Sequence, residues 1–198
     1  MQKMVMQLQK VRQSLQVILN ECERKGTDLA PPDPRQFVEE VDITPKLPSK
    51  LHAGLTSSKW KERKEVLDDL LTLLNATPRI KEAPEFGELS KALALRVQTD
   101  ANINCVMVAA QCLEGLAKGL MGGYGRYREV VVPPMLDRLK ERKASVTETI
   151  SAALHAIFET VREPHYLLRS SILNAVVDHI SGHLRRRSPR FVQQEPPS

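Results

Sequence analysis

The residues best suited to contact another molecule stand in one short run, residues 57–65, which reads Ser-Ser-Lys-Trp-Lys-Glu-Arg-Lys-Glu. This run holds Trp60, the only tryptophan in a chain in which aromatic residues make up 4%. Tryptophan combines a large apolar area with one polar N–H group, so proteins use it in cores and on partner surfaces. The sequence leaves two interpretations open: Trp60 is a contact anchor among charges, or its ring packs into its own helix pair.

Patterns for catalysis and metal binding are weak. The glycine-rich run 121–125 lacks the lysine and the preceding strand of a phosphate-binding loop. His179 and His183 are four residues apart on a predicted helix, a spacing that can hold zinc, but a structural zinc needs four ligands and a solvent-facing pair is the better interpretation. We therefore expect no enzyme, no cofactor, no metal and no small-molecule substrate.

The composition is that of a soluble globular protein, with 41% hydrophobic and 27% charged residues. The formal net charge of +5 favours an acidic protein partner but is too small to indicate nucleic acid. The three cysteines, at 22, 105 and 112, form no Cys-x-x-Cys pair, which fits a reducing intracellular compartment. No signal peptide or bilayer-spanning run is predicted, so we expect a cytosolic protein without a membrane partner.

Residues 1–25 repeat apolar side chains at spacings of three and four, which predicts an N-terminal amphipathic helix. Its seam lasts only about three heptads, so a helix lying on the following domain is preferred, with weak self-association through residues 1–22 as the alternative. Residues 26–40 are expected to be a proline-rich linker, because proline blocks helix and strand alike. We expect 161–184 to be a C-terminal helix that could cap the domain, and 185–198 to be a basic disordered tail.

Between these segments the pattern predicts helices and almost no strand. The expected helices are 48–57, 58–75, 85–97, 102–120, 126–139 and 145–160, with a glycine turn at 121–125 and a kink or restart at Pro133 and Pro134. They form pairs of about forty residues that begin near 48, 86 and 127. That period predicts an all-α fold, an α-solenoid of HEAT or armadillo type. The short polar turns within the pairs, 56–60, 99–104 and 141–145, then align along one edge, where function should lie.

At these turns the chain resembles a TOG domain, the HEAT-repeat module of the ch-TOG/mini spindles family of microtubule polymerases. The resemblance covers residues 41–160. It rests on the entry Val-Asp-Ile at 41–43 before Lys-Leu-Pro at 46–48, the run 57–65, Thr-Asp-Ala-Asn-Ile-Asn at 99–104, Ala-Lys-Gly-Leu at 117–120, and Lys-Glu-Arg-Lys at 140–143 followed by Ser-Val at 145–146.

The resemblance implies that the αβ-tubulin dimer or the microtubule is the partner, because TOG domains bind curved tubulin through the aligned turns. It implies that Trp60 packs on β-tubulin and that basic residues of later turns pair with acidic tubulin surface. The tubulin-binding residues implied by position are Trp60, Lys61, Asn102, Ile103, Asn104, Arg142 and Lys143. It also implies a regulator of microtubule dynamics and spindle organisation, found in the cytoplasm on microtubules, the spindle and the centrosome.

The chain departs from the family in its repeat number. A full TOG domain has six repeats, and only three match here, so we expect a domain truncated after about three repeats. Two alternatives to tubulin binding stay open: a HEAT-repeat scaffold or adaptor that binds another acidic protein, and a truncated isoform with little affinity for tubulin.

Overall fold

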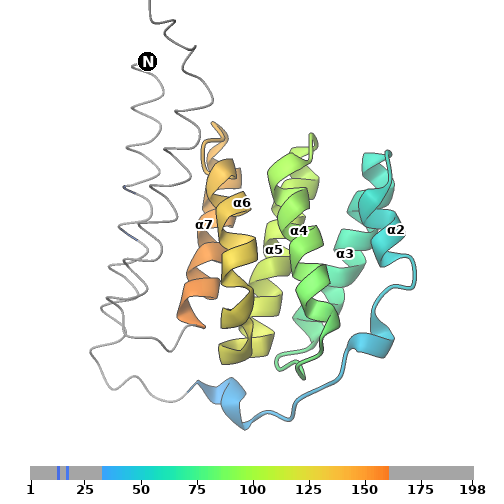
Figure 1. The fold of residues 1–198 in the computed structure, drawn as a ribbon, viewed down its shortest axis with the longest axis vertical. Helices are drawn as coiled ribbons and strands as arrows, with labels where there is room; N and C mark the ends of the chain where they lie inside the picture. The colour runs from blue at the N-terminus through green and yellow to red at the C-terminus, as the bar shows by residue number, and fades with distance from the viewer. Residues whose placement is uncertain (1–12, 14–16, 18–32, 161–198) are drawn as a thin grey trace, which may run out of the picture.

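The structure is a computed structural model that describes Gln13, Val17 and residues 33–160. Its described part is helical and confirms the predicted α-solenoid of helix pairs (Figure 1). The α-helices are α2 (Leu51–Thr56), α3 (Trp60–Ala76), α4 (Glu85–Thr99), α5 (Ile103–Leu120), α6 (Arg128–Arg138) and α7 (Ala144–Glu159), and the 3-10 helices are η1 (Pro34–Phe37), η2 (Thr44–Lys46) and η3 (Met121–Tyr127). The predicted segments 161–184 and 185–198, and nearly all of 1–25, lie outside the described residues.

The helices form two layers. In Figure 1, α2, α4 and α6 lie in one row and α3, α5 and α7 in the other, and neighbours within each row contact one another. Each pair of consecutive helices, α2–α3, α4–α5 and α6–α7, contributes one helix to each layer. This is the arrangement in which repeats bury their apolar faces against adjacent repeats.

Helix α5 is the centre of the core. It packs against α3, α4 and α7, and its buried side chains include Val106, Leu113 and Leu116. The stretch 103–138 contains an 18-residue window that is apolar enough by composition to cross a bilayer, but 56% of that window is buried inside the protein. The low charge of α5 is therefore explained by its central place in the core.

Between α5 and α7 the structure corrects one local prediction and narrows another. Residues 121–127 form the 3-10 helix η3 rather than an open glycine turn; the chain changes direction at Met121, which has a positive φ of 51°. Pro133 and Pro134 do not restart the helix, because both lie inside the single helix α6. Val131, Val132, Met135 and Leu136 of α6 are buried, and this packing offsets the loss of the hydrogen bonds that prolines cannot donate.

The end of the predicted linker is structured. Asp33 caps η1 by accepting a hydrogen bond from the Arg35 N–H (2.9 Å), and Pro34 stands at the first helical positions, where its missing N–H costs nothing. Residues 33–47, which we call the strap, run along the lower end of the helices in Figure 1. Val41 pairs with Ile80 in an isolated parallel bridge, and Ile43 is fully buried. The strap is therefore part of the folded unit.

Candidate protein-binding edge

Three turns lie at the end of the helices that is uppermost in Figure 1, opposite the strap. They are residues 57–59 between α2 and α3, residues 100–102 between α4 and α5, and residues 139–143 between α6 and α7. We call these turns, with the first residues of the helices that follow them, the turn edge. The predicted alignment of the intra-pair turns therefore agrees with the arrangement of the helices.

The first turn is fixed by hydrogen bonds of its own side chains. The Ser57 hydroxyl accepts from the Lys59 N–H (3.1 Å) and donates to Glu62 Oε2 (2.7 Å), while Lys59 Nζ contacts Glu62 Oε1 (2.8 Å). These contacts place Trp60 as the first residue of α3. Trp60 is 42% exposed, so a large part of the ring is available to a partner. Lys61, the next residue, is exposed.

The second turn is fixed by Asp100 and Asn102. Asp100 Oδ1 accepts from the Asn102 N–H (2.8 Å), and Asn102 Oδ1 caps α5 by accepting from the Asn104 N–H (2.9 Å). Such a cap satisfies a backbone donor that a helix start otherwise leaves without a partner. Asn104 is exposed, Asn102 is half-buried, and Ile103 is half-buried with its side chain packed against the core.

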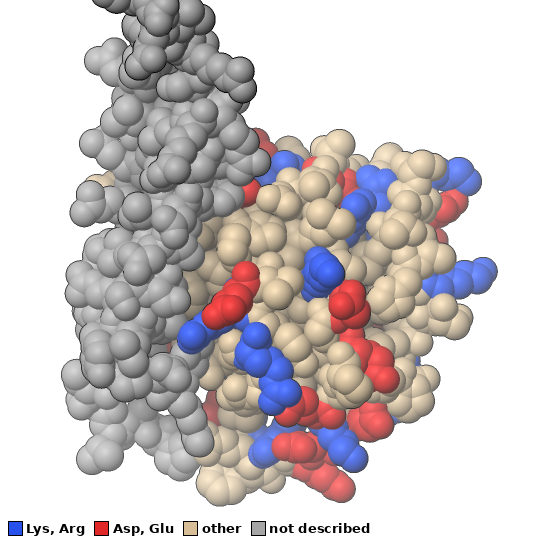
Figure 2. All heavy atoms as spheres, in the orientation of Figure 1, with Lys and Arg blue, Asp and Glu red and all other residues tan. Residues whose placement is uncertain are grey.

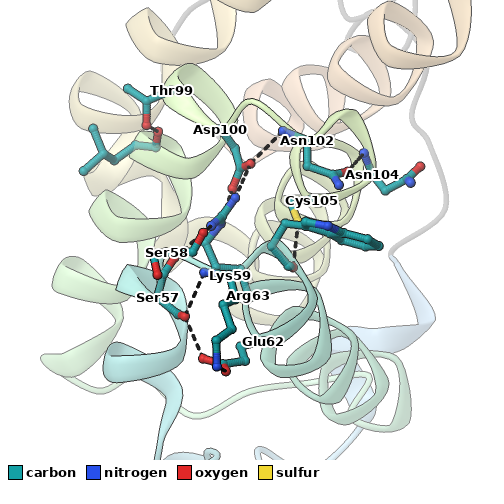
Figure 3. Close-up of polar contacts among 12 residues, drawn as sticks. Ser57, Ser58, Lys59, Glu62, Arg63, Thr99, Asp100, Asn102, Asn104 and Cys105 are labelled. Carbon is teal, nitrogen blue, oxygen red and sulfur yellow. Dashed lines mark hydrogen bonds and ion pairs between the residues drawn. The ribbon is translucent and has the colours of Figure 1, made fainter.

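A buried ion pair joins the first turn to the second (Figure 3). Arg63 on α3 donates from Nε to Asp100 Oδ2 (2.7 Å) and from Nη2 to Asp100 Oδ1 (2.8 Å). Its Nη1 donates to the carbonyls of Ser57 (2.8 Å) and Ser58 (3.1 Å). The two side chains are 10% and 0% exposed. One guanidinium group therefore holds the backbone of the first turn and the carboxylate of the second.

This pairing also determines the ionisation of Asp100. Burial opposes the charged form, but the hydrogen bonds from the Arg63 guanidinium and the Asn102 N–H outweigh it, so the pKa of Asp100 lies below its ordinary value. A paired buried carboxylate of this kind is ionised at neutral pH.

Arg138 extends the connection towards the third turn. Its Nη2 donates to the Asp100 carbonyl (2.9 Å) and its Nη1 to the Gln98 carbonyl (3.4 Å). Arg138 also stands 3.8 Å from Glu141 of the third turn. We call Arg63, Asp100 and Arg138 the inter-turn chain, because together they connect all three turns.

The third turn presents positive charge. Arg142 and Lys143 are both exposed, and the N–H of Arg142 donates to Glu141 Oε1 (3.4 Å). The structure thus places all seven predicted residues on the turn edge, with Ile103 and Asn102 less exposed than the others. Lys143 is the residue before α7 and has no capping hydrogen bond from its side chain.

The inter-turn chain was not among the features predicted from the sequence. A usable signal was present: Arg63, Asp100 and Arg138 are charged residues of alternating sign that follow one another by 37 and 38 residues, close to the repeat length. In a solenoid, residues one repeat apart lie in adjacent units, so opposite charges at that spacing can meet.

Other surfaces show less organisation. Among residues 33–160 and the two described residues before them, no group of three or more His, Cys, Asp and Glu side chains could hold a metal ion. A hollow beside the strap is lined by both signs of charge, including Arg35, Arg79, Glu82 and Arg126, with Arg126 and Glu82 paired at 2.7 Å. On the face formed by α2, α4 and α6, Figure 2 shows basic and acidic side chains interspersed.

Comparison with known proteins identifies relatives of one kind. The chain matches no family model. It is 41% identical over 128 residues to the spindle pole body component alp14 of Schizosaccharomyces pombe, which is 65% of this chain and 16% of alp14. It is 32% identical over 162 residues to centrosomal protein 224 of Dictyostelium discoideum (82% of this chain, 8% of that protein), and 36% identical over 126 residues to mini spindles of Drosophila melanogaster (64% and 6%). The chain thus spans about a sixth or less of these relatives.

Solved structures agree. A chain from a study of microtubule plus-end tracking by XMAP215, CLIP-170 and EB1 is 30% identical, with a TM-score of 0.65 over 73% of this chain and 60% of that chain. A chain from a study of tubulin recruitment and assembly by microtubule polymerases with TOG domain arrays is 26% identical, with a TM-score of 0.65 over 81% of this chain and 36% of that chain.

The fold defines an α-solenoid of HEAT-type helix pairs whose intra-pair turns are aligned along one edge. Together with the relatives, this arrangement identifies the described unit as a TOG-type HEAT-repeat domain of the mini spindles kind. The resemblance predicted from the turns is confirmed.

Proposed function

We propose that this chain binds the αβ-tubulin dimer, free or at the microtubule, through the turn edge. The observation that carries the proposal is the exposure of Trp60 on the first turn, in line with the basic residues Arg142 and Lys143 on the third. The structures that the fold resembles come from studies of microtubule tracking and tubulin recruitment, which supports the same partner.

Each part of the edge has a physical task in this proposal. Trp60 supplies the apolar anchor, since exposed aromatic side chains that become buried contribute most to binding. Lys61, Arg142 and Lys143 attract an acidic surface and raise the association rate. Asn102 and Asn104 offer amide hydrogen bonds at the rim, and Ile103 contributes the exposed part of its side chain. None of these tasks needs catalytic chemistry or a cofactor.

In the cell this activity would regulate microtubule dynamics and spindle organisation, in the cytoplasm on microtubules, the spindle and the centrosome. The names of two relatives, a spindle pole body component and a centrosomal protein, support these locations. A single tubulin-binding unit holds one dimer, so any polymerase activity would require several units held together to raise the local tubulin concentration.

The test is size-exclusion chromatography of the full chain with soluble αβ-tubulin at low and at moderate salt. We expect co-elution that weakens as salt rises, because exposed charges are screened. Trp60→Ala should lower the affinity by about 30-fold, as expected for loss of a central aromatic anchor.

Phe37→Ala is the matched control, since Phe37 is another exposed aromatic residue (79%) but lies on η1, away from the turns. It should bind tubulin like the unmodified chain. A folded, helical chain that fails to co-elute at low salt would refute the proposal, and equal losses in the two variants would refute the role of Trp60.

A further inference from the structure

The third turn carries a pattern that tubulin binding by itself does not require. Residues 142–146 read Arg-Lys-Ala-Ser-Val, which places basic residues three and two positions before Ser145 and an apolar residue directly after it. Kinases select substrates by such charge patterns, and this one suits a kinase with an acidic substrate groove. Arg142, Lys143 and Ala144 are all exposed, so the determinants that precede Ser145 are accessible.

We propose that Ser145 is a phosphorylation site for a basophilic serine/threonine kinase, and that phosphate at this position weakens binding of an acidic partner at the turn edge. In the reaction, Ser145 Oγ attacks the γ-phosphorus of ATP. The new Oγ–P bond forms as the bond from that phosphorus to the β,γ-bridging oxygen breaks, ADP leaves, and the hydroxyl proton passes to the base of the kinase. The effect on binding, unlike the modification, rests on the proposed function.

The structure places Ser145 in the first turn of a helix, the part of the helix that has to open for a kinase to reach it. Ser145 is the second residue of α7 and half-buried, and within residues 33–160 its hydroxyl makes one weak polar contact, to Met107 Sδ at 4.0 Å. Val146 is fully buried, so the first turn of α7 must open for an extended substrate to fit. Lys143 gives this helix start no side-chain cap, unlike Asn102 at the start of α5, and uncapped terminal turns open more easily than helix interiors.

The other serines of the edge and of α7 fit this role less well. The Ser57 hydroxyl is occupied by contacts with Lys59 and Glu62. Ser151, further along α7, follows Glu148 and Thr149 and so lacks the basic residues.

The phosphate would act through charge. A phosphoserine carries about −1.5 to −2 charges at pH 7, which offsets the two positive charges of Arg142 and Lys143 next to it. The start of the 16-residue helix α7 favours negative charge, so the modified turn would be stable. The basic end of the turn edge would then be neutral or slightly acidic, and an acidic partner would lose its attraction there.

The experiment treats the full chain with Mg-ATP and the catalytic subunit of cyclic-AMP-dependent protein kinase, and maps the phosphorylated residues by mass spectrometry. Ser188 follows three arginines in the sequence, so its modification is the internal sign that the kinase is active on this chain. Ser145→Ala removes the site, and Ser151→Ala is the matched control on the same helix. Chain carrying Ser188→Ala is used for the tubulin measurement, so that Ser145 accounts for any change.

We expect phosphate on Ser145 in the unmodified chain and in Ser151→Ala, and a strong reduction in Arg142→Ala. Phosphorylation should lower tubulin affinity about fivefold to tenfold, the size expected for two exposed ion pairs, with a weaker salt dependence. Phosphate on Ser188 but not on Ser145 would refute Ser145 as a phosphorylation site. An unchanged tubulin affinity after full phosphorylation of Ser145 would refute the proposed effect on binding. If the untreated chain fails to bind tubulin, the proposed function fails, while the mass spectra still decide whether Ser145 is modified.

Discussion

At the scale of single residues, the side chains that organise the turn edge differ from those proposed to bind. Trp60, Lys61, Arg142 and Lys143 are exposed, whereas Arg63 and Asp100 are buried beneath them. An exposed charge can be recognised in the sequence by its setting. A buried pair leaves a weaker signal, here a charge spacing of about one repeat, and its contact is established only when both partners are placed in space.

Asp100→Asn tests the inter-turn chain. The change leaves the Arg63 charge buried without its carboxylate, so the free energy of unfolding at pH 7 should fall by about 2–4 kcal/mol. Asp68→Asn is the control, because Asp68 pairs with Lys64 on the exposed surface of α3 and should cost less than about 0.5 kcal/mol. Urea unfolding followed by circular dichroism measures both, and equal costs would contradict the buried role of Asp100.

The same variant gives a pH dependence. Because the pKa of Asp100 is lowered in the folded chain, its ionised form contributes stability that is fully present above its unfolded pKa of about 4 and is lost as pH falls through the folded value. The unmodified chain should therefore lose more stability than Asp100→Asn when urea unfolding is repeated between pH 6 and pH 3.

At the scale of elements, apolar periodicity predicted the α-helices to within a few residues. The sequence could not show how closely two helices approach. A Cβ added to Gly54 of α2 would lie 2.6 and 2.7 Å from the two methyl groups of Val66 on α3. Rotation of the branched valine side chain cannot move both methyl groups away. The close approach of α2 to α3 therefore depends on glycine at position 54.

Gly54→Ala should therefore destabilise the chain by about 1–3 kcal/mol, although alanine has the better helix propensity. Adding Val66→Ala to this variant removes the clash. The double variant should therefore lose less stability than the sum of the losses in the two single variants. Thermal unfolding of the unmodified chain, Gly54→Ala, Val66→Ala and the double variant tests this. Strictly additive costs would show that the contact does not limit the packing.

At the scale of the whole molecule, the strap connects the repeats along the edge opposite the turns. Arg35 Nη1 donates to the Lys118 carbonyl (3.3 Å), Arg79 pairs with Glu40 (2.8 Å), and Ile43 enters the core. A residue of α5 and a residue of the loop between α3 and α4 thus contact one strap. We infer that the strap supports the spacing of the repeats and hence of the turns.

Ile43→Ala should lower the free energy of unfolding by about 2–4 kcal/mol through the cavity it leaves and should expose the strap to protease. Val38→Ala, at an exposed apolar position of the strap, should change stability by less than about 0.5 kcal/mol. Urea unfolding and limited proteolysis give the two readouts. Unchanged proteolysis in Ile43→Ala would show that burial of this side chain does not hold the strap.

The sequence by itself determined the helical class, the forty-residue pairing and the family of the turns, because these follow from local periodicity and from short motifs that keep their order along the chain. The seven tubulin-contact residues stay predictions. Tertiary structure alone decided three features: the strap, the continuity of α6 through Pro133 and Pro134, and the Arg63–Asp100–Arg138 connection. Each depends on side chains distant in sequence that meet in a buried setting, where packing and the low dielectric override local preference.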